Sequence, residues 1–286
     1  MKSSMDDENS IPSKEQSETL MTFGGHLEVL RQMLFRIIGV VCAIAIIVFC
    51  FKETTWNVLL APSEWDFITY RCLETVIQAM GTHFLFEEYH VNLIATDLSS
   101  QFMMHITTAV YLGLLGASPY ILYELFRFIT PALYENERKY SVKVAGIIYL
   151  LFLLGVMMSY FVLFPMSFRF LGTYSVSPKV VSNITLDSYI SSFVSLTLVM
   201  GVVFQLPVIT FFLGKKGVVT SETLSHYRRH SFIILMLVAA IITPPDLMTL
   251  ILVTIPLYLL YEISIRIVDR VEPKGGNVHK VLMEDE

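Results

Sequence analysis

The sequence predicts an all-α integral membrane protein whose helices form a six-span bundle. Only 16% of its 286 residues are charged and 54% are apolar, whereas roughly a quarter of all residues are charged in soluble domains. Long runs with few or no charges recur along the chain, and about 20 apolar residues suffice to span a bilayer as a helix. The predicted spans cover about residues 33–51, 101–126, 144–168, 188–214, 231–245 and 247–263.

The placement of Lys and Arg predicts that both termini face the cytoplasm. With the N-terminus inside, 16 of the 20 basic residues fall in inner segments, which agrees with the excess of Lys and Arg in cytoplasmic loops. An even number of spans puts the C-terminus on the same side. The basic residues of the outer segments are then Lys52, Arg71, Arg169 and Lys179.

A membrane domain, residues 22–267, is predicted between two cytoplasmic tails, residues 1–21 and 268–286. The first 20 residues carry five acidic and two basic side chains, with no apolar core of signal-peptide length. We therefore expect a disordered tail there and no cleavable signal.

Amphipathic helices are predicted next to the first span on both sides of the membrane. The inner helix is expected to run along the interface before it turns into the span. The outer helix belongs to the long periplasmic loop, residues 52–100, and is expected to lie along the membrane surface. The inner apolar stripe comprises Leu27, Leu30, Leu34 and Ile37, and the outer stripe Trp65, Ile68, Cys72, Val76 and Met80.

The last two spans are predicted to be short. Residues 231–245 and 247–261 each form an uncharged stretch of 15 residues, which is about 22 Å of helix against roughly 30 Å of hydrocarbon. The TPPD segment, Thr243–Asp246, leaves almost no external loop between them. We expect this part of the bundle to thin the bilayer or to be sheltered by longer neighbours.

Ordinary catalytic signatures are missing from the sequence. It contains no HExxH, GxSxG, Walker or GxGxxG motif. His226 and His230 have metal-ligand spacing, but two histidines without a third ligand are typical of a polar inner loop. Cys42, Cys50 and Cys72 offer no disulfide framework, since only one of them lies in an outer loop. We therefore expect no enzyme, no cofactor and no metal site.

Polar residues inside the apolar runs are candidates for function, because they are costly in a membrane. Gln205 lies in the middle of the fourth span and is followed by Pro207. It could hold two helices together or contact another protein's helix, and the residues alone leave both open. Asp246 is predicted to cap the last helix, and Glu262 to pair with Arg266 four residues on. Two further polar residues are expected at the interfaces, His105 and Glu124.

The charged segment FRFITPALYENERKYSVK, residues 126–143, separates two apolar runs. Pro131 is predicted to end the second span and to begin the next helical turn. The carboxylates of Glu135 and Glu137 could receive a guanidinium in a bidentate pair, which suits arginine-bearing peptides. On chemistry alone, a solvated turn is the simpler interpretation.

Seven motifs, in their order and spacing, resemble the TatC family, the core subunit of twin-arginine protein translocases. The resemblance runs from about Thr22 to Arg266 and implies a concave, cupped bundle. FRFITPALYENER and TPPD are its most specific parts. The motifs are GHLEVLRQ, LLAP, IATDLSSQF, PYILYELFRFITPALYENERK, FVLFPMSFRFL, VFQLPV and ITPPDLMT.

The resemblance implies a receptor in the bacterial cytoplasmic (inner) membrane. TatC-like proteins bind the twin-arginine signal peptides of folded cargo proteins at their cytoplasmic face. With TatA-type and often TatB-type single-span subunits, and other copies of themselves, they export folded proteins using the proton-motive force. They are not enzymes, and no nucleic acid is involved.

The resemblance also implies a signal-peptide site. The family's acidic residue of the first inner loop falls on Glu137, beside Phe128 and Arg138. The family's Glu of the N-terminal segment aligns with Val29, and the carboxylate stands one place earlier, at Glu28. One residue rotates a group by about 100° around a helix. The other matching residues of that segment are His26, Leu27, Leu30 and Arg31.

Five further positions are carried over from the family. Gln205 stands where many relatives carry Glu, and it is expected with Pro207 to contact a partner helix. Pro62, Pro131 and Asp246 are expected to have structural or functional roles.

Three alternative classes were weighed against the receptor: a secondary transporter, an intramembrane protease and a membrane scaffold. A transporter needs an ion or substrate site near the midplane, and the sequence supplies only Gln205 there. A protease needs paired aspartates or a Ser/His arrangement at depth, and His105 has no obvious nucleophile beside it in the sequence. If the protein were a membrane scaffold, the charged segment 126–143 would be a turn without a binding role.

Overall fold

The computed structural model describes most of the chain. It covers residues 23–81, 88–89, 91–133, 138–175, 177, 183–243 and 246–271, and it gives only the backbone for 23–27, 129–133 and 138–143. The predicted tail 1–21 and residues 272–286 of the second predicted tail lie outside the described residues.

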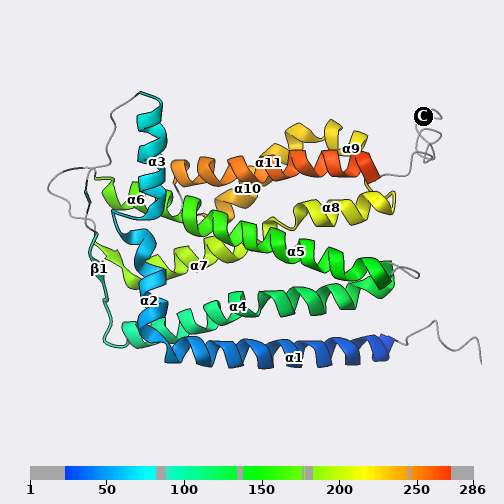
Figure 1. The fold of residues 1–286 in the computed structure, drawn as a ribbon, viewed down its shortest axis with the longest axis horizontal. Coiled ribbons are helices and arrows are strands. Elements are labelled where there is room, and N and C mark those ends of the chain that lie inside the picture. The colour runs from blue at the N-terminus through cyan, green and yellow to red at the C-terminus, as the bar shows by residue number, and fades with distance from the viewer. Residues whose placement is uncertain are drawn as a thin grey trace, which may run out of the picture.

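Most of the described chain is helical, and the long helices lie side by side along the long axis of the molecule (Figure 1). The third apolar run is built from α5, a π-helical turn at Ser159–Leu163 and α6. The helices are α1 (Phe23–Cys50), α2 (Lys52–Leu60), α3 (Ile68–Ala79), α4 (Ser100–Leu133), α5 (Arg138–Met158), α6 (Phe164–Thr173), α7 (Leu186–Val203), α8 (Leu206–Lys215), α9 (Ser221–His226), α10 (Arg228–Ile242) and α11 (Leu247–Val271).

Five helical stretches of the described chain are long and apolar enough to cross a bilayer. They correspond to five of the six predicted spans. The remaining prediction, 231–245, falls largely on α10, whose 15 residues extend for about 22 Å; it is as short as expected. The last helix is longer than expected, because α11 runs on to Val271 with Glu262 and Arg266 inside it. The five stretches are Glu28–Cys50, Ser100–Phe128, Val144–Thr173, Leu186–Lys215 and Leu247–Val271.

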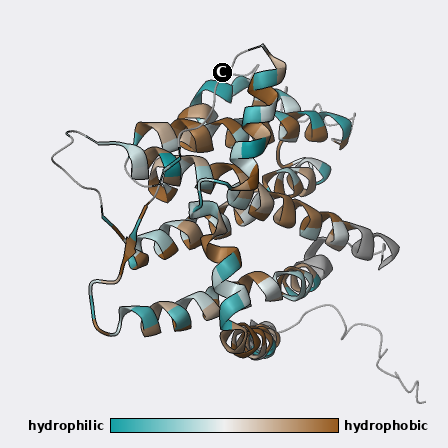
Figure 2. Cartoon of the chain, turned by 60° about the vertical axis from the view of Figure 1, so that its left-hand side comes forward, coloured by the Kyte–Doolittle hydropathy of each residue, from teal (hydrophilic) through white to brown (hydrophobic). Residues whose placement is uncertain are grey.

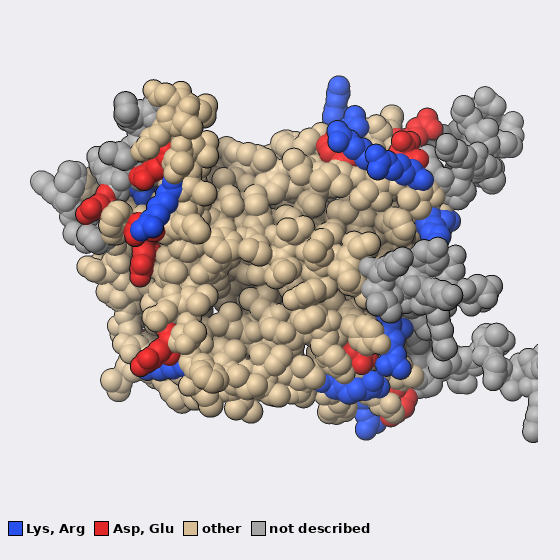
Figure 3. Space-filling view, in the orientation of Figure 1, with Lys and Arg blue, Asp and Glu red and all other residues tan. Residues whose placement is uncertain are grey.

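Charged side chains gather at the two ends of the molecule. Figure 3 shows a broad uncharged surface between them, and apolar residues colour much of the length of the long helices in Figure 2. Large apolar side chains in this band are exposed, including Ile46 (65%) and Ile241 (77%). Because helices satisfy their own backbone hydrogen bonds, such a band suits the hydrocarbon of a bilayer.

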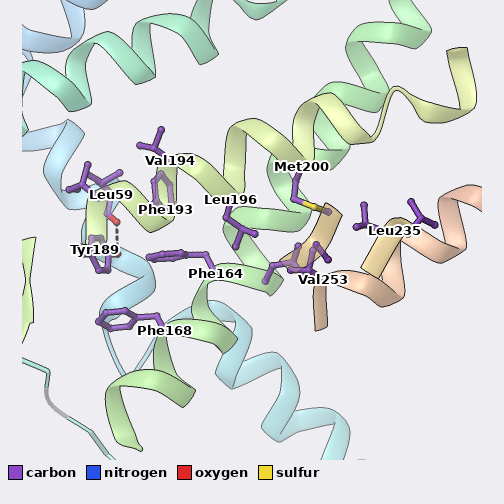
Figure 4. Packing of buried hydrophobic residues seen from close by; sticks show 14 of the residues in the cluster. Leu59, Phe164, Phe168, Tyr189, Phe193, Val194, Leu196, Met200, Leu235 and Val253 are labelled. Carbon is purple, nitrogen blue, oxygen red and sulfur yellow. Dashed lines mark hydrogen bonds between the residues drawn. The ribbon is translucent and has the colours of Figure 1, made fainter. Parts of the chain in front are cut away.

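Buried aromatic side chains form the densest packing, between α6 and α7 (Figure 4). The ring of Phe164 meets those of Tyr189 and Phe193 edge to face, with centroids 5.1 and 5.0 Å apart. Phe168 meets Tyr189 in the same way at 5.0 Å. Such edge-to-face pairs contribute about 1 kcal/mol each beyond the area they bury.

The same cluster is joined to the cap at the end of the bundle. The hydroxyl of Tyr189 donates to the carbonyl of Leu59 in α2 at 2.8 Å, the bond dashed in Figure 4. A 3-10 turn, Ala61–Ser63, follows α2 and contains the buried Pro62.

The two loops at this end are paired through a short parallel sheet. Strand β1, Leu93–Ile94, pairs with β2, Ile184–Thr185. The guanidinium of Arg169 lies over the rings of Tyr70 and Tyr89, at 4.9 and 4.7 Å from their centroids. The loops are therefore tied to α6 by stacking as well as by the strands.

The predicted outer amphipathic helix is present as α3, which lies across the ends of the long helices in Figure 1. Its apolar stripe is exposed at Trp65 (41%), Ile68 (58%), Val76 (56%) and Met80 (79%). A stripe of this kind at a bundle end fits the predicted position along a membrane surface.

Two expectations about helix boundaries are wrong. The predicted inner interfacial helix does not turn into the first span, because α1 is one continuous helix from Phe23 to Cys50. Pro131 does not end the second span either, since α4 continues to Leu133. A proline removes only its own N–H donor and its φ is compatible with a helix, so the helix passes it before it stops.

Candidate functional site

One end of the bundle brings together the starts of α1, α5 and α10 and the ends of α4, α8 and α11 (Figure 1). The described basic residues near these helix ends are Arg31, Arg36, Arg127, Lys215, Lys216, Arg228, Arg229, Arg266 and Arg270. All of them belong to the group that the sequence predicts to be cytoplasmic. The grouping at one end is therefore as predicted, and we call this the basic end.

The first part of α1 presents an exposed carboxylate at the basic end. Glu28 forms an ion pair with Arg31 at 3.6 Å, and their side chains are 52% and 69% exposed. Gln32 donates to Glu28 at 3.3 Å, and the Arg31 guanidinium lies 5.9 Å from the centroid of Phe35. Because both partners are solvated, this pair is weak, and Glu28 can exchange Arg31 for another guanidinium.

An ion pair between a half-exposed arginine and a buried glutamate joins α1 to α4 a little further into the bundle. Arg36 Nη1 lies 3.3 Å from Glu124 Oε1, and the hydroxyl of Tyr120 donates to the same oxygen at 3.0 Å. Glu124 is only 6% exposed. Glu124 is thus buried against α1, where a cation and a hydrogen-bond donor satisfy its carboxylate, as a buried charge requires.

The sequence contains a signal for this pair. Arg36 stands a few residues inside the first apolar run, and Glu124 stands just before the end of the second. Adjacent antiparallel helices place those two positions at the same depth. Opposite charges at equal depth in neighbouring spans are expected to pair.

The other residues of the predicted signal-peptide site lie at or beyond the end of α4. Phe128 is half-buried, one helical turn after Glu124. Glu137 lies outside the described residues, as does Glu135. Arg138 begins α5, and its side chain is not described. The structure therefore brings Glu28, Arg31 and Phe128 to the same end of the bundle as the end of α4 and the start of α5.

Gln205 stands at a break between two helices. The break separates α7 from α8, and Pro207, which is buried, lies at the start of α8. The Gln205 side-chain amide donates to the carbonyl of Ile148 in α5 at 3.1 Å. Its Oε1 is buried with no hydrogen-bond partner among the described residues. Gln205 thus holds α5 and the α7–α8 break together, which is one of the two roles left open by the sequence.

Glu262 pairs between helices, and the predicted pair with Arg266 is wrong. Its carboxylate lies 3.1 Å from Arg228 Nε of α10 and accepts from Tyr258 at 3.0 Å. The α10 helix starts beside this part of α11, so the cation of the neighbouring helix is better placed than the one on the next turn. Nearby, Tyr227 stacks edge-on with the two histidines that have ligand spacing, His226 and His230.

Asp246 lies at the opposite end of the bundle, where it caps α11. Its Oδ1 accepts from the Thr249 amide at 2.6 Å. This bond satisfies one of the free N–H groups at the start of a helix and confirms the predicted cap. Asp246 is therefore explained by local structure.

An apolar hollow of about 640 Å³ follows the exposed face of α10 and α11. Exposed side chains line it, such as Met236 (39%), Ile251 (49%) and Ile255 (61%). Glu262 and Arg266 stand at its end nearest the basic end. The side chains that line the hollow are mostly apolar, as in a groove that receives an apolar helix.

These features define a polytopic α-helical membrane protein with an exposed acidic and basic helix end, and without a catalytic constellation among its described residues. The family model described as Sec-independent protein translocase protein (TatC) matches residues 25–256. The chain belongs to the TatC family. It is a component of a protein translocase and a multi-pass bacterial membrane protein.

Relatives and solved structures agree with this assignment. The chain is 34% identical over 251 residues to the Sec-independent protein translocase protein TatC of Blattabacterium sp. subsp. Periplaneta americana (strain BPLAN), covering 86% of this chain and 94% of the relative. It is 38% identical over 181 residues to TatCy of Bacillus subtilis (strain 168), covering 63% of this chain and 71% of the relative. A crystal structure described as the twin arginine translocase receptor TatC superposes with a TM-score of 0.68 at 30% identity, covering 86% of this chain and 99% of that one.

Proposed function

We propose that this protein is the receptor subunit of a twin-arginine translocase and binds twin-arginine signal peptides at the basic end, facing the cytoplasm. The observation that carries the proposal is the Arg36–Glu124 pair. It fastens α1 to α4, so that Glu28 and Arg31 stay at the same end as Phe128 and the following segment. Two parts of the chain that are about 100 residues apart are thereby held as one surface.

The chemistry of this surface suits a peptide with adjacent arginines and an apolar stretch. The carboxylates of Glu137 and Glu28 would each accept a guanidinium, with Glu137 as the stronger acceptor because Glu28 is already paired with Arg31. Apolar side chains of α1 are exposed around Glu28, including Val29 (40%) and Leu34 (54%). They would contact the apolar part of the signal.

Partner subunits would dock on the membrane-embedded faces. The hollow along α10 and α11 fits a single apolar helix of a TatA-type or TatB-type subunit. Gln205 and Pro207 mark a helix break, and a second helix could approach beside it. With such partners and further copies of itself, the protein would export folded cargo using the proton-motive force.

Photocrosslinking of a twin-arginine signal peptide to membranes containing the protein tests the receptor role. We expect Glu137→Ala to lower crosslinking about tenfold, the effect of one lost charge-assisted pair. Glu28→Ala should lower it about threefold, because that carboxylate is exposed and shared with Arg31. Glu222→Ala, which removes an exposed acid elsewhere at the basic end, is the matched control. Equal crosslinking in all four proteins would move the arginine site elsewhere.

Glu124→Gln tests the fastening of α1 to α4 separately. The amide keeps the shape but leaves Arg36 without its counter-charge, so α1 should loosen and crosslinks from probes on α1 should weaken. Crosslinks from probes near Glu137 should remain. If the double variant, with Arg36→Gln and Glu124→Gln, loses no more of the α1 crosslinking than either single variant, the two residues act as a pair. Additive losses would contradict the pairing.

A further inference from the structure

A second hollow, of about 770 Å³, opens at the end of the molecule opposite the basic end. It lies where α2 passes the start of α4, and β1 and the start of α7 close it. The lining residues are Lys52, Glu53, Trp56, Asn57, Leu60, Leu93, Gln101, Phe102, His105 and Leu186. None of them belongs to the proposed signal-peptide surface or to the groove along α10 and α11.

The polar groups of this hollow are not used by the rest of the described protein. The side chains of Lys52, Glu53, Asn57 and Gln101 form no hydrogen bond or ion pair with any described residue. His105 Nε2 is buried and likewise has no hydrogen-bond partner among the described residues. The four side chains of Lys52, Glu53, Asn57 and Gln101 are exposed and so are free to contact a polar ligand, while the buried nitrogen of His105 is the one unpaired group of the hollow that is costly.

The imidazole of His105 is held in place by aromatic neighbours. Its ring stacks on Phe49 with a centroid distance of 4.2 Å and an interplanar angle of 12°. The ring of Trp56 lies 6.4 Å away. His105 is therefore oriented by packing in the wall of the hollow.

The hollow stands at the level where a bilayer changes from hydrocarbon to headgroups. The apolar helix α1 ends at Cys50, two residues before Lys52, and α4 begins at Ser100, next to Gln101. Charged side chains reappear at this end of the molecule in Figure 3. A tryptophan such as Trp56 is typical of this interfacial level.

An exposed apolar track leads from the hollow toward the middle of the molecule. Phe102 (61%), Ile106 (38%) and Val110 (49%) are exposed at intervals of four residues along α4. They form one helical stripe about 12 Å long, and Phe102 also lines the hollow. A hydrocarbon chain attached to a group in the hollow would lie along this stripe.

We propose that this hollow binds a zwitterionic aminophospholipid, with its phosphate toward Lys52 and His105 and its ammonium toward Glu53. The charges decide the class of lipid: one cation and one anion, adjacent in α2, complement a headgroup of zero net charge better than an anionic one. Trp56 adds a ring face for the ammonium, and an acyl chain follows Phe102 and Ile106. The proposal depends only on the position of the protein in a membrane and is independent of the receptor function.

Native mass spectrometry of the purified full-length protein tests this site. The protein is delipidated in detergent and offered phosphatidylethanolamine and phosphatidylglycerol at equal concentration. We expect one phosphatidylethanolamine to bind about tenfold more tightly than phosphatidylglycerol, the effect of one charge-assisted contact. Lys52→Gln and His105→Phe should each lower its occupancy several-fold; the phenylalanine keeps the stacking on Phe49 and removes only the nitrogen.

Two further variants make the assignment specific. Glu53→Gln removes the acceptor for the ammonium, so the preference should shift toward phosphatidylglycerol while Lys52 still holds the phosphate. Glu64→Gln, an exposed acid at the same end that does not line the hollow, should change nothing. The site is refuted if occupancy is the same in the native chain, Lys52→Gln and His105→Phe. The zwitterionic assignment is refuted if the native chain prefers phosphatidylglycerol or if Glu53→Gln leaves the preference unchanged.

Discussion

The two sides of the bundle are stabilised in different ways. Only 11% of the most apolar stretch of α1 is buried within the molecule, against 44% for α11. The α11 side shares the aromatic cluster of α6 and α7 and has a buried interior, with Val253 and Leu257 inaccessible. The helix α1 lies at the lower edge in Figure 1, beside α4. We call these the packed side and the open edge.

The difference shows that few protein contacts suffice to hold α1 in the bundle. Its contact with α4 combines close approach at a small residue, Gly113 against Ala45, with the Arg36–Glu124 pair. Small residues and interhelical polar contacts are the usual means of association in lipid, where the hydrophobic effect gives no drive between helices. The open edge carries the proposed signal-peptide surface and the proposed lipid site, while the packed side provides a rigid support.

The largest effect is expected on the packed side, from Gly155→Ala in α5. An added Cβ would lie 2.5 Å from the backbone carbonyl oxygen of Met200 in α7, and Met200 is fully buried. Two helix backbones would have to separate, so we expect a net loss of about 2 kcal/mol in the free energy of unfolding. Unfolding in mixed micelles followed by circular dichroism measures it.

Gly146→Ala in the same helix is the control for that substitution. Nothing lies within 4 Å of an added Cβ there, so the variant should gain up to about 1 kcal/mol from the higher helix propensity of alanine. Equal stabilities of the Gly155 and Gly146 variants would contradict the close approach of α5 and α7.

A smaller effect is expected at the open edge, from Gly113→Ala. The added Cβ would lie 2.9 Å from Ala45 Cβ, but α1 is exposed on its other side and can shift. We expect a loss between zero and about 1 kcal/mol by the same unfolding measurement. A loss as large as that of Gly155→Ala would mean that α1 is held as firmly as the packed side, and the contrast between the two sides would be wrong.

The smallest effect is a pH dependence in the cap beside the packed side. Arg71 donates hydrogen bonds to Asp66 and holds the pKa of that carboxyl below its usual range. Since the pKa is lowered by folding, the pair stabilises the protein above the ordinary carboxyl pKa, about 3.9, and the contribution is lost as pH falls through the lowered pKa. Both side chains are exposed, so the effect should be small.

Comparison of the native chain with Asp66→Asn isolates the contribution of the Asp66 charge to stability. The native chain should melt slightly above the variant at pH 6, and the difference should shrink as the pH falls below the ordinary carboxyl pKa, about 3.9. A difference as large at pH 3 as at pH 6 would show that Asp66 acts through packing and not through its charge.

Much of the fold could be predicted from residue patterns alone. Apolar runs place the long helices, and the stripe of Trp65 and Ile68 predicts α3, because both signals depend on neighbours in sequence. Helix ends were harder: Pro131 lies inside α4, since a single proline costs one hydrogen bond and the helix has others. Glu262 was assigned to the wrong cation because the partner, Arg228, is 34 positions away in sequence and only the packing of α10 on α11 brings it close.

The residues of the candidate site also differ in whether the sequence alone could assign them. Glu28, Arg31 and the segment with Glu137 could be assigned to it only through the motifs that resemble the TatC family. The Arg36–Glu124 pair and the unused polar groups around His105 required coordinates, because each depends on two helices meeting at one depth.

The sequence by itself determined that this chain is a membrane protein, where its long helices run, and which family it belongs to. Those properties follow from the cost of placing charges in hydrocarbon and from motifs read along the chain. The tertiary structure decided which charges pair, which side of the bundle is packed and which is open, and where hollows remain. These properties depend on distances between segments far apart in sequence. The attraction between two opposite charges offsets the cost of their desolvation only where the packing brings the two side chains into contact.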